Sequence, residues 1–199
     1  MIPRFGSRRR GWIGLLGGSF NPAHEGHAHV ARLARRRLRL DQVWLLVSPG
    51  NPLKPTRGMA PFAERLASAR AIADGRRIVA TGIEAQLGTR YTADTLRELR
   101  RRFPRLRFVW LMGADNLAQL PRWHHWRAIA ADAAFAVMPR PTYNHRALAG
   151  LAARRLRGAR HPAHTAPALA GMDPPAWVFL PAPQNTASAT AIRAAASGV

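Results

Sequence analysis

Short, wholly apolar runs alternate with longer amphipathic segments along almost the whole chain. Runs such as VWLLV and FVWLM are apolar on both faces, which is typical of parallel strands covered by helices on both sides. The sequence therefore predicts an α/β fold built on a doubly wound parallel sheet. No linker divides the chain, so we expect one domain over residues 1–199, with a basic N-terminal arm over residues 1–11 that could be mobile.

Hydrophobic periodicity places the individual elements. Residues 157–175 are rich in Pro, Ala and His, and this composition predicts a mobile surface loop. Parallel sheets bind ligands beyond the carboxyl ends of their strands, so the residues that follow each strand are the candidates for a site. The expected strands cover residues 12–16, 42–49, 76–84, 106–113, 133–139 and 177–181, and the expected helices cover residues 26–38, 62–73, 92–103, 115–120, 123–131, 144–156 and 190–196.

The charge of the chain is strongly positive. Among 199 residues there are 31 Lys and Arg against 10 Asp and Glu, a net charge of +21. Binding to nucleic acid is one interpretation. The arginines, however, are scattered over several expected helices, in RLARRRLRL, RELRRRF and LAARRLRG, which is typical of solvated helix faces. An anionic small-molecule substrate fits the charge equally well, and we expect no nucleic acid as the main partner.

Several classes of protein are excluded by composition. The chain has no cysteine, which excludes disulfides, thiolate metal sites and a cysteine nucleophile. It has no apolar run long enough for a transmembrane helix, and its basic start is not followed by the apolar core of a signal peptide. We therefore expect a cytoplasmic protein without a membrane partner.

The segment GGSFNPAHEGH follows the first expected strand and opens the first expected helix. Glycines let the backbone approach a ligand closely, and a helix start offers N–H groups and a positive dipole end that attract phosphate. His24 and His27 are three residues apart, so both can face one anion. A metal pair is the alternative, but it needs a third ligand, and Glu25 would point away from the two histidines on a helix. The segment therefore predicts a phosphate site.

This segment resembles the signature of the HxGH nucleotidylyltransferases, which have a Rossmann-like fold and transfer a nucleotide by attack on the α-phosphate of a nucleoside triphosphate. Within that superfamily the chain is similar to the bacterial nicotinate-nucleotide adenylyltransferases. The resemblance extends over nearly the whole chain, mostly at strand ends. It includes VSPGNPLK, RYTADTLREL, FVWLMGADNLAQLPRWHHW, VMPRPTY and SATAIR.

The resemblance implies two sets of ATP contacts. His24, His27 and Arg193 are the catalytic candidates, since they would stabilise charge that develops on the phosphates. The closing block usually has a second serine where this chain has Ala189, which leaves backbone contacts but removes one side-chain contact. The expected ATP-binding residues are Gly17, Gly18, Ser19, Phe20, His24, His27, Ser188, Thr190, Ile192 and Arg193.

The resemblance also implies a site for nicotinate mononucleotide. Trp123 would stack on the pyridine ring, because indole faces attract cationic rings. The backbone N–H groups at Thr92 would face the carboxylate, and Asp115 would lie by the sugars or cap the next helix. We expect Trp126 in the core and His124 and His125 as surface or packing residues. The expected mononucleotide-binding residues are Asn21, Lys54, Tyr91, Thr92, Asp115, Trp123 and Arg140.

The implied reaction joins ATP and nicotinate mononucleotide to give deamido-NAD and pyrophosphate. The sequence has no dense carboxylate cluster, so we expect no protein metal site and a Mg²⁺ ion held mainly by substrate phosphates. Assembly into a homo-oligomer stays open.

Two alternatives remain at this stage. One is a related adenylyltransferase that acts on pantetheine phosphate or nicotinamide mononucleotide, and the other is a basic nucleic-acid binder. The binder would explain the charge but none of the strand-end blocks.

Overall fold

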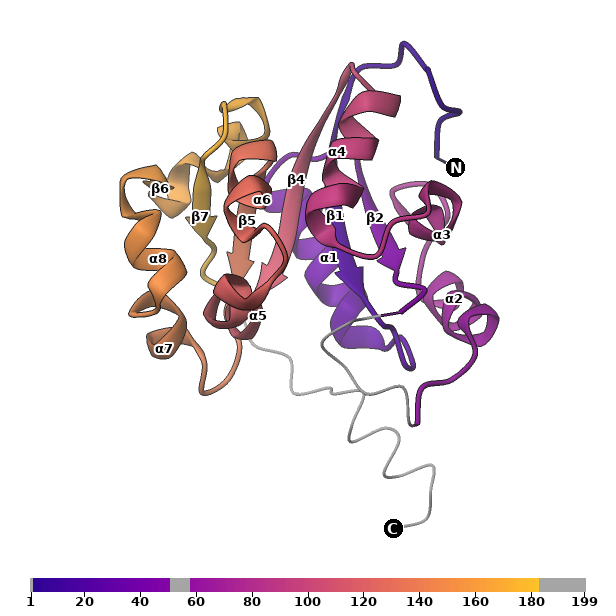
Figure 1. Ribbon diagram of the computed structural model, residues 1–199, viewed down its shortest axis with the longest axis horizontal. Coiled ribbons are helices and arrows are strands. Elements are labelled where there is room, and N and C mark those ends of the chain that lie inside the picture. Colours follow the sequence, from indigo (N-terminus) through magenta and orange to yellow (C-terminus); the bar gives the residue numbers. More distant parts are fainter. Residues whose placement is uncertain (1, 51–57, 183–199) are drawn as a thin grey trace.

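The computed structural model describes residues 2–50 and 58–182. Its centre is a seven-stranded sheet in the order β3-β2-β1-β4-β5-β7-β6, with every neighbouring pair parallel (Figure 1). The expected Rossmann-like α/β class is confirmed. The strands are β1 (Gly11–Gly18), β2 (Gln42–Val47), β3 (Ile78–Thr81), β4 (Leu106–Gly113), β5 (Ala134–Met138), β6 (Arg160–His161) and β7 (Trp177–Phe179).

Helices cover both faces of the sheet, and each face has its own apolar cluster. One cluster joins the sheet to α1, α2 and η3, and the other joins it to α3, α4, α5, α6, α7 and α8. Strand β2 is buried at all of its positions, which explains why its sequence is apolar without alternation. The helices are α1 (Glu25–Arg37), α2 (Phe62–Ala71), α3 (Ile83–Leu87), α4 (Thr92–Arg102), α5 (Ala114–Gln119), α6 (Trp126–Asp132), α7 (Asn144–Leu148) and α8 (Leu151–Arg155), with 3₁₀ turns η1 (Leu120–Arg122), η2 (Arg157–Ala159) and η3 (Ala163–Gly171).

The sheet order fixes where a ligand can lie. The chain runs outward from β1 through β2 to β3, and then returns to the other side of β1 with β4. The order therefore reverses between β1 and β4, and the connections that follow these two strands leave to opposite sides of a crevice. The GGSF and GADN segments begin at the carboxyl ends of these two strands.

Three expectations about elements were wrong. Residues 157–175 do not form a plain surface loop, since they contain β6 and η3, and η3 buries Ala166, Leu169 and Ala170 against the sheet. The single helix expected over residues 144–156 is two helices, α7 and α8, separated at Gly150. The third strand ends at Thr81, and the residues after it form α3. The helix expected over residues 190–196 lies outside the described residues.

The basic segment before β1 contacts the end of α4. The ring of Phe5 lies 5.6 Å from that of Phe103, and the guanidinium of Arg102 lies 4.5 Å from the Phe5 ring centroid. The backbone N–H of Gly6 donates to the carbonyl of Arg102. Within the described residues, no helix has the length and apolar character needed to cross a membrane.

Candidate active site

A cavity of about 590 Å³ opens at the carboxyl ends of β1 and β4. This is the size range of a small-molecule site. Its wall combines the turn after β1, the start of α4, the segment from α5 to α6 and the end of β5. The predicted site residues that line it are Gly17, Gly18, Ser19, Phe20, Asn21, His27, Tyr91, Thr92, Asp115, Trp123 and Arg140.

The end of β1 is tightly packed against β4, and a sharp turn follows it. A Cβ atom at Gly17 would lie 2.7 Å from Cη2 of Trp110, so only glycine fits this position without a shift of the indole. Phe20 has a φ of 48°, in the left-handed region that bulky residues rarely adopt. Its side chain is buried, and its ring centroid lies 4.8 Å from that of His27. The chain thus turns sharply here and delivers His27 to the cavity.

The two histidines form a reciprocal cap on α1. Nδ1 of His24 accepts from the backbone N–H of Gly26 at 3.2 Å, and Nδ1 of His27 accepts from the backbone N–H of His24 at 3.2 Å. Because a neutral imidazole that accepts at Nδ1 carries its proton on Nε2, we infer that Nε2 is the donor atom of both rings. Burial, and then the charge of Arg140, lower the pKa of His24.

The metal interpretation of this segment finds no support in the position of Glu25. Its carboxylate is exposed and pairs with Arg32, farther along α1. No group of three or more His, Asp or Glu side chains that could hold a metal ion occurs in residues 2–50 and 58–182.

Asp115 and Arg140 face each other at the edge where the carboxyl ends of β4 and β5 lie. Asp115 lies in the first turn of α5 and Arg140 follows β5, and their Oδ1 and Nε atoms are 3.7 Å apart. Oδ1 of Asp115 is buried and has no hydrogen-bond partner among the described residues. A Cβ atom at Gly113 would lie 3.0 Å from Nε of Arg140 and would overlap the Asp115 carboxylate. The glycine therefore makes room for this pair.

Aromatic side chains form another part of the cavity wall. The Trp123 ring meets that of Trp110 edge to face, with centroids 6.4 Å apart, and is only partly buried. Tyr91 lies 4.4 Å from His124 between ring centroids. Trp126 packs against the core as expected. His124 was expected on the surface or in packing, and the structure places it both in contact with Tyr91 and in the cavity wall.

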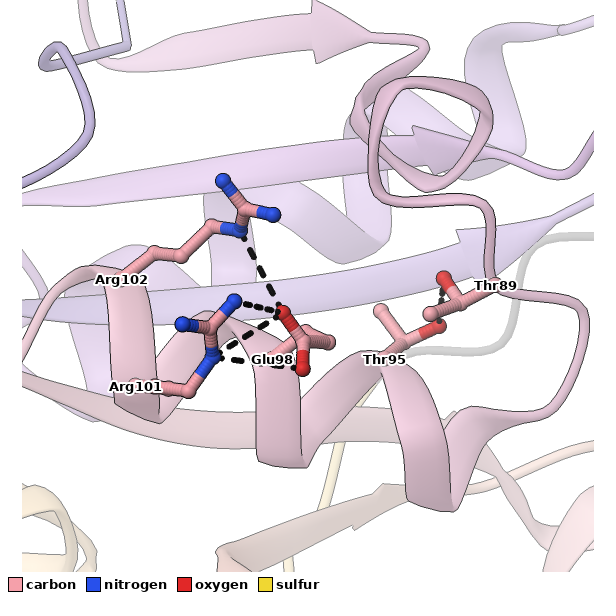
Figure 2. A network of polar contacts seen from close by, with 5 residues as sticks. All are labelled: Thr89, Thr95, Glu98, Arg101 and Arg102. Atoms are coloured by element: carbon pink, nitrogen blue, oxygen red, sulfur yellow. Dashed lines mark hydrogen bonds and ion pairs between the residues drawn. The ribbon is translucent and has the colours of Figure 1, made fainter.

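A buried polar cluster supports the start of α4. The hydroxyls of Thr89 and Thr95 are 2.9 Å apart, and the Thr95 hydroxyl donates to Oε1 of Glu84 at 3.1 Å. Figure 2 shows the Thr89–Thr95 contact near the start of α4, and Glu98 with Arg101 and Arg102 near its end. Glu84 is 7% exposed, and burial raises its pKa to about 7.

Sequence reasoning missed several residues of the wall. Glu84 was included in an expected strand, although it follows Thr81, where β3 ends. A strand end placed three residues earlier would have made it a candidate. The other cavity residues that sequence reasoning did not single out include Ser48, Arg90, Trp110, Asn116, Gln119 and Arg122.

The structure does not reach all of the expected site. Lys54 and the closing block with Ser188, Ala189, Thr190, Ile192 and Arg193 lie outside the described residues. His24 stands beside the wall, with its ring centroid 3.9 Å from that of His27.

The chain is similar to known proteins over most of its length. The family model described as cytidylyltransferase-like matches residues 15–195. A probable nicotinate-nucleotide adenylyltransferase of Gluconacetobacter diazotrophicus is 62% identical over 195 residues, covering 98% of this chain and 91% of that protein. One of the same name from Gluconobacter oxydans is 63% identical over 181 residues, covering 91% of this chain and 93% of that protein.

A solved structure shares the fold. It is the nicotinic acid mononucleotide adenylyltransferase of Plasmodium falciparum complexed with NaAD, with a TM-score of 0.69 and 16% identity, covering 92% of this chain and 82% of that one. At this identity the likeness shows the fold alone. The family match and the curated relatives go further and confirm the resemblance expected from the sequence. The chain belongs to the cytidylyltransferase-like family and, within it, to the nicotinate-nucleotide adenylyltransferases.

Proposed function

We propose that this chain transfers the adenylyl group of ATP to nicotinate mononucleotide, giving deamido-NAD and pyrophosphate. One observation carries the proposal. His27, in the first turn of α1, and the aromatic residues around Trp123, which we call the acceptor side, line one cavity at the carboxyl ends of β1 and β4. ATP phosphates at the first and a pyridine ring at the second would bring the two reacting phosphates together.

The geometry suits a reaction driven by positioning and charge stabilisation. The phosphate of the mononucleotide is already ionised, so it attacks the α-phosphate in line and needs no general base. The His27 Nε2–H and the start of α1 would stabilise the negative charge that grows on the triphosphate. The pyrophosphate leaves with the bonding electron pair, and no covalent enzyme intermediate forms.

The acceptor side of the cavity is suited to bind a carboxylated pyridine ring. Backbone N–H groups at the first turn of α4, near Tyr91 and Thr92, would donate to the carboxylate. The face of Trp123 would stack on the positively charged ring. Arg140 also lines the cavity, as do Arg90 and Arg122, which were not expected from the sequence. The wall is therefore suited to anionic ligands.

The donor set suits a metal ion carried by the substrate. Asp115, the carboxylate expected beside the nucleotide sugars, lines the cavity and already faces Arg140. Such a site fits a Mg²⁺ ion bound through phosphates and water better than a protein cage. When bound, the ion neutralises phosphate charge and lowers the barrier to attack. We further propose a cytoplasmic location, with ATP and the mononucleotide as partners, and leave a homo-oligomer to direct measurement of mass.

A turnover assay with product analysis tests the proposal. The purified chain is incubated with ATP, Mg²⁺ and nicotinate mononucleotide, and the products are separated by chromatography. We expect deamido-NAD and pyrophosphate in equal amounts. Parallel reactions with nicotinamide mononucleotide and phosphopantetheine test the related acceptors, and RNA filter binding tests the nucleic-acid alternative. If phosphopantetheine were the only acceptor that gave an adenylylated product, the proposal would be contradicted.

A further inference from the structure

The side chain of Arg65, in α2, is enclosed by backbone carbonyl groups. Arg65 is 3% exposed and makes four hydrogen bonds, all to carbonyl oxygens. Its Nε donates to Ala60 at 2.9 Å, and its Nη1 donates to both Ser19 and Ser48 at 2.7 Å. Its Nη2 donates to Pro49 at 3.3 Å. A single guanidinium thus joins three separate segments of the chain.

Two of these segments are the loops that follow β1 and β2. The strand pairing ends at the pair Gly18 and Val47, and one more backbone bond joins the N–H of Ser48 to the carbonyl of Gly18 at 3.0 Å. Beyond that bond the guanidinium lies between the carbonyls of Ser19 and Ser48. It therefore bridges the two loops where direct strand-to-strand bonding stops.

The charge of Arg65 is not balanced by an ion pair in the part of the chain that the structure describes. Burial lowers the pKa of Arg65. A buried charge is a poor way to gain stability alone, because desolvation offsets much of what the interactions contribute. Its loss, in turn, removes the one donor group that the carbonyls of Ser19, Ser48, Pro49 and Ala60 share. This arrangement indicates a demand for fixed geometry rather than for bulk stability.

Two of the carbonyls that Arg65 holds belong to residues of the cavity wall. Ser19 and Ser48 both line the cavity. The residue after Ser19 is Phe20, whose backbone lies in the left-handed region and whose buried ring packs against that of His27. A shift of the Ser19 carbonyl would therefore be transmitted over one residue to the imidazole that faces the triphosphate.

We propose that Arg65 is a positioning residue for adenylyl transfer, which fixes the loops after β1 and β2 relative to each other and thereby sets the placement of His27. The inference rests on the proposed function, because it assigns Arg65 a part in that reaction. It adds a residue on α2 that does not line the main cavity and acts only through backbone atoms.

Kinetics of Arg65→Ala and Arg65→Lys, with Arg70→Ala as control, provide the first test. Arg70 is an exposed arginine in the last turn of the same helix. A displacement of about 1 Å in a reacting group lowers turnover ~100-fold. We expect that loss in kcat for Arg65→Ala, about a tenfold loss for Arg65→Lys, which keeps the charge but not the fork, and no loss for the control. The KM for the mononucleotide should change by less than about threefold.

Guanidinium rescue separates positioning from a merely structural part. Millimolar guanidinium ion should raise the kcat of Arg65→Ala at least ~10-fold, because it restores planar donors to the vacated site, whereas sodium chloride at the same concentration should not. If Arg65→Ala does not fold, Arg65→Lys decides the matter. An Arg65→Lys protein with the kcat of the wild type would overturn the proposal, whatever its melting temperature.

Hydrogen–deuterium exchange gives a readout that does not depend on turnover. Peptides that cover residues 17–21 and 47–50 should exchange faster in Arg65→Lys than in wild type and in the Arg70→Ala control. Unchanged exchange in these peptides would contradict the proposed bridge. If the wild type forms no dinucleotide, the proposed function fails, and the exchange result still judges the bridge made by Arg65.

Discussion

The imidazole rings of His24 and His27 lie against each other at the first turn of α1, with centroids 3.9 Å apart, and their Nδ1 atoms accept from the backbone N–H groups of Gly26 and His24, respectively. His24 therefore has two separable roles, as the cap of a helix and as a proposed phosphate donor. These roles can be separated because other side chains can accept the capping hydrogen bond.

Substitution of His24 by Asn and by Ala should separate capping from chemistry. Asn accepts the N–H bond of a helix start, whereas Ala does not, so His24→Ala should be less stable by about 1 kcal/mol than His24→Asn. Both variants lack the imidazole Nε2–H and should lose turnover to a similar extent. Urea unfolding and kcat measured on the same preparations check this. Full activity in His24→Asn would remove His24 from the catalytic set.

His27→Ala should lower turnover sharply while the fold persists. The loss of a donor that stabilises developing charge typically lowers kcat by ~10²–10³-fold. The nearby His29, on the same helix, provides the matched control as His29→Ala, since it does not line the cavity. Steady-state kinetics with circular dichroism check both variants. A His27→Ala enzyme within a few-fold of wild type would contradict the assignment.

Glu84 should make stability fall as the pH rises. Burial raises its pKa from 4.5 to about 7, so the folded protein keeps a proton that the unfolded chain has lost. Unfolding between these pH values releases that proton, and the stability contributed by the protonated form is therefore lost as the pH rises from about 4.5 to about 7. At ~1.4 kcal/mol per pH unit, the loss is up to roughly 3 kcal/mol.

Urea unfolding at pH 5 and pH 8 checks this for wild type and Glu84→Gln. The neutral amide has no proton to release, so Glu84→Gln should become more stable relative to wild type at the higher pH. Glu98→Gln is the control, because its partners Arg101 and Arg102 lower rather than raise the pKa of the exposed Glu98 carboxyl. A wild-type and Glu84→Gln pair whose difference in unfolding free energy is the same at both pH values would refute the prediction.

Trp123→Ala should weaken the use of both nicotinate and nicotinamide mononucleotides and leave their ratio unchanged. The indole would stack on either ring, and a stacked cation is worth ~0.5–2 kcal/mol. The kcat/KM values of Trp123→Phe should lie between those of Trp123→Ala and those of the wild type. The kcat/KM values for both acceptors check this. A ratio that changes tenfold would show that Trp123 reads the carboxylate instead of the ring.

Much of the fold could be predicted because most strands are recognisable from their apolar sequences. The runs in β2 and β4 are apolar at nearly every position, and this pattern has few interpretations other than a parallel strand. The segment over residues 157–175 could not be predicted in this way. Its buried residues are mainly small alanines between prolines, and only packing against the sheet shows which of them are inside.

The candidate site, likewise, could be predicted from the sequence only in part. Residues directly after strands, such as Asp115, could be found because parallel strands end at one edge of the sheet. Arg65 could not be found, since one arginine among many has no distinguishing mark and its partners are backbone carbonyls from loops far apart in sequence. Glu84 was missed because the expected third strand was extended past Gly82 to residue 84, whereas β3 ends at Thr81.

The most direct test of the account is the ratio of kcat/KM for nicotinate mononucleotide to that for nicotinamide mononucleotide with the wild-type enzyme and ATP. The two acceptors differ only in a carboxylate against an amide. Charge-assisted hydrogen bonds from the start of α4 are worth ~1.5–3 kcal/mol each, so one or two of them predict a preference of about tenfold to ~10⁴-fold for the acid. Equal use of the amide would contradict the acid-specific account, and no dinucleotide from either acceptor would contradict adenylyl transfer itself.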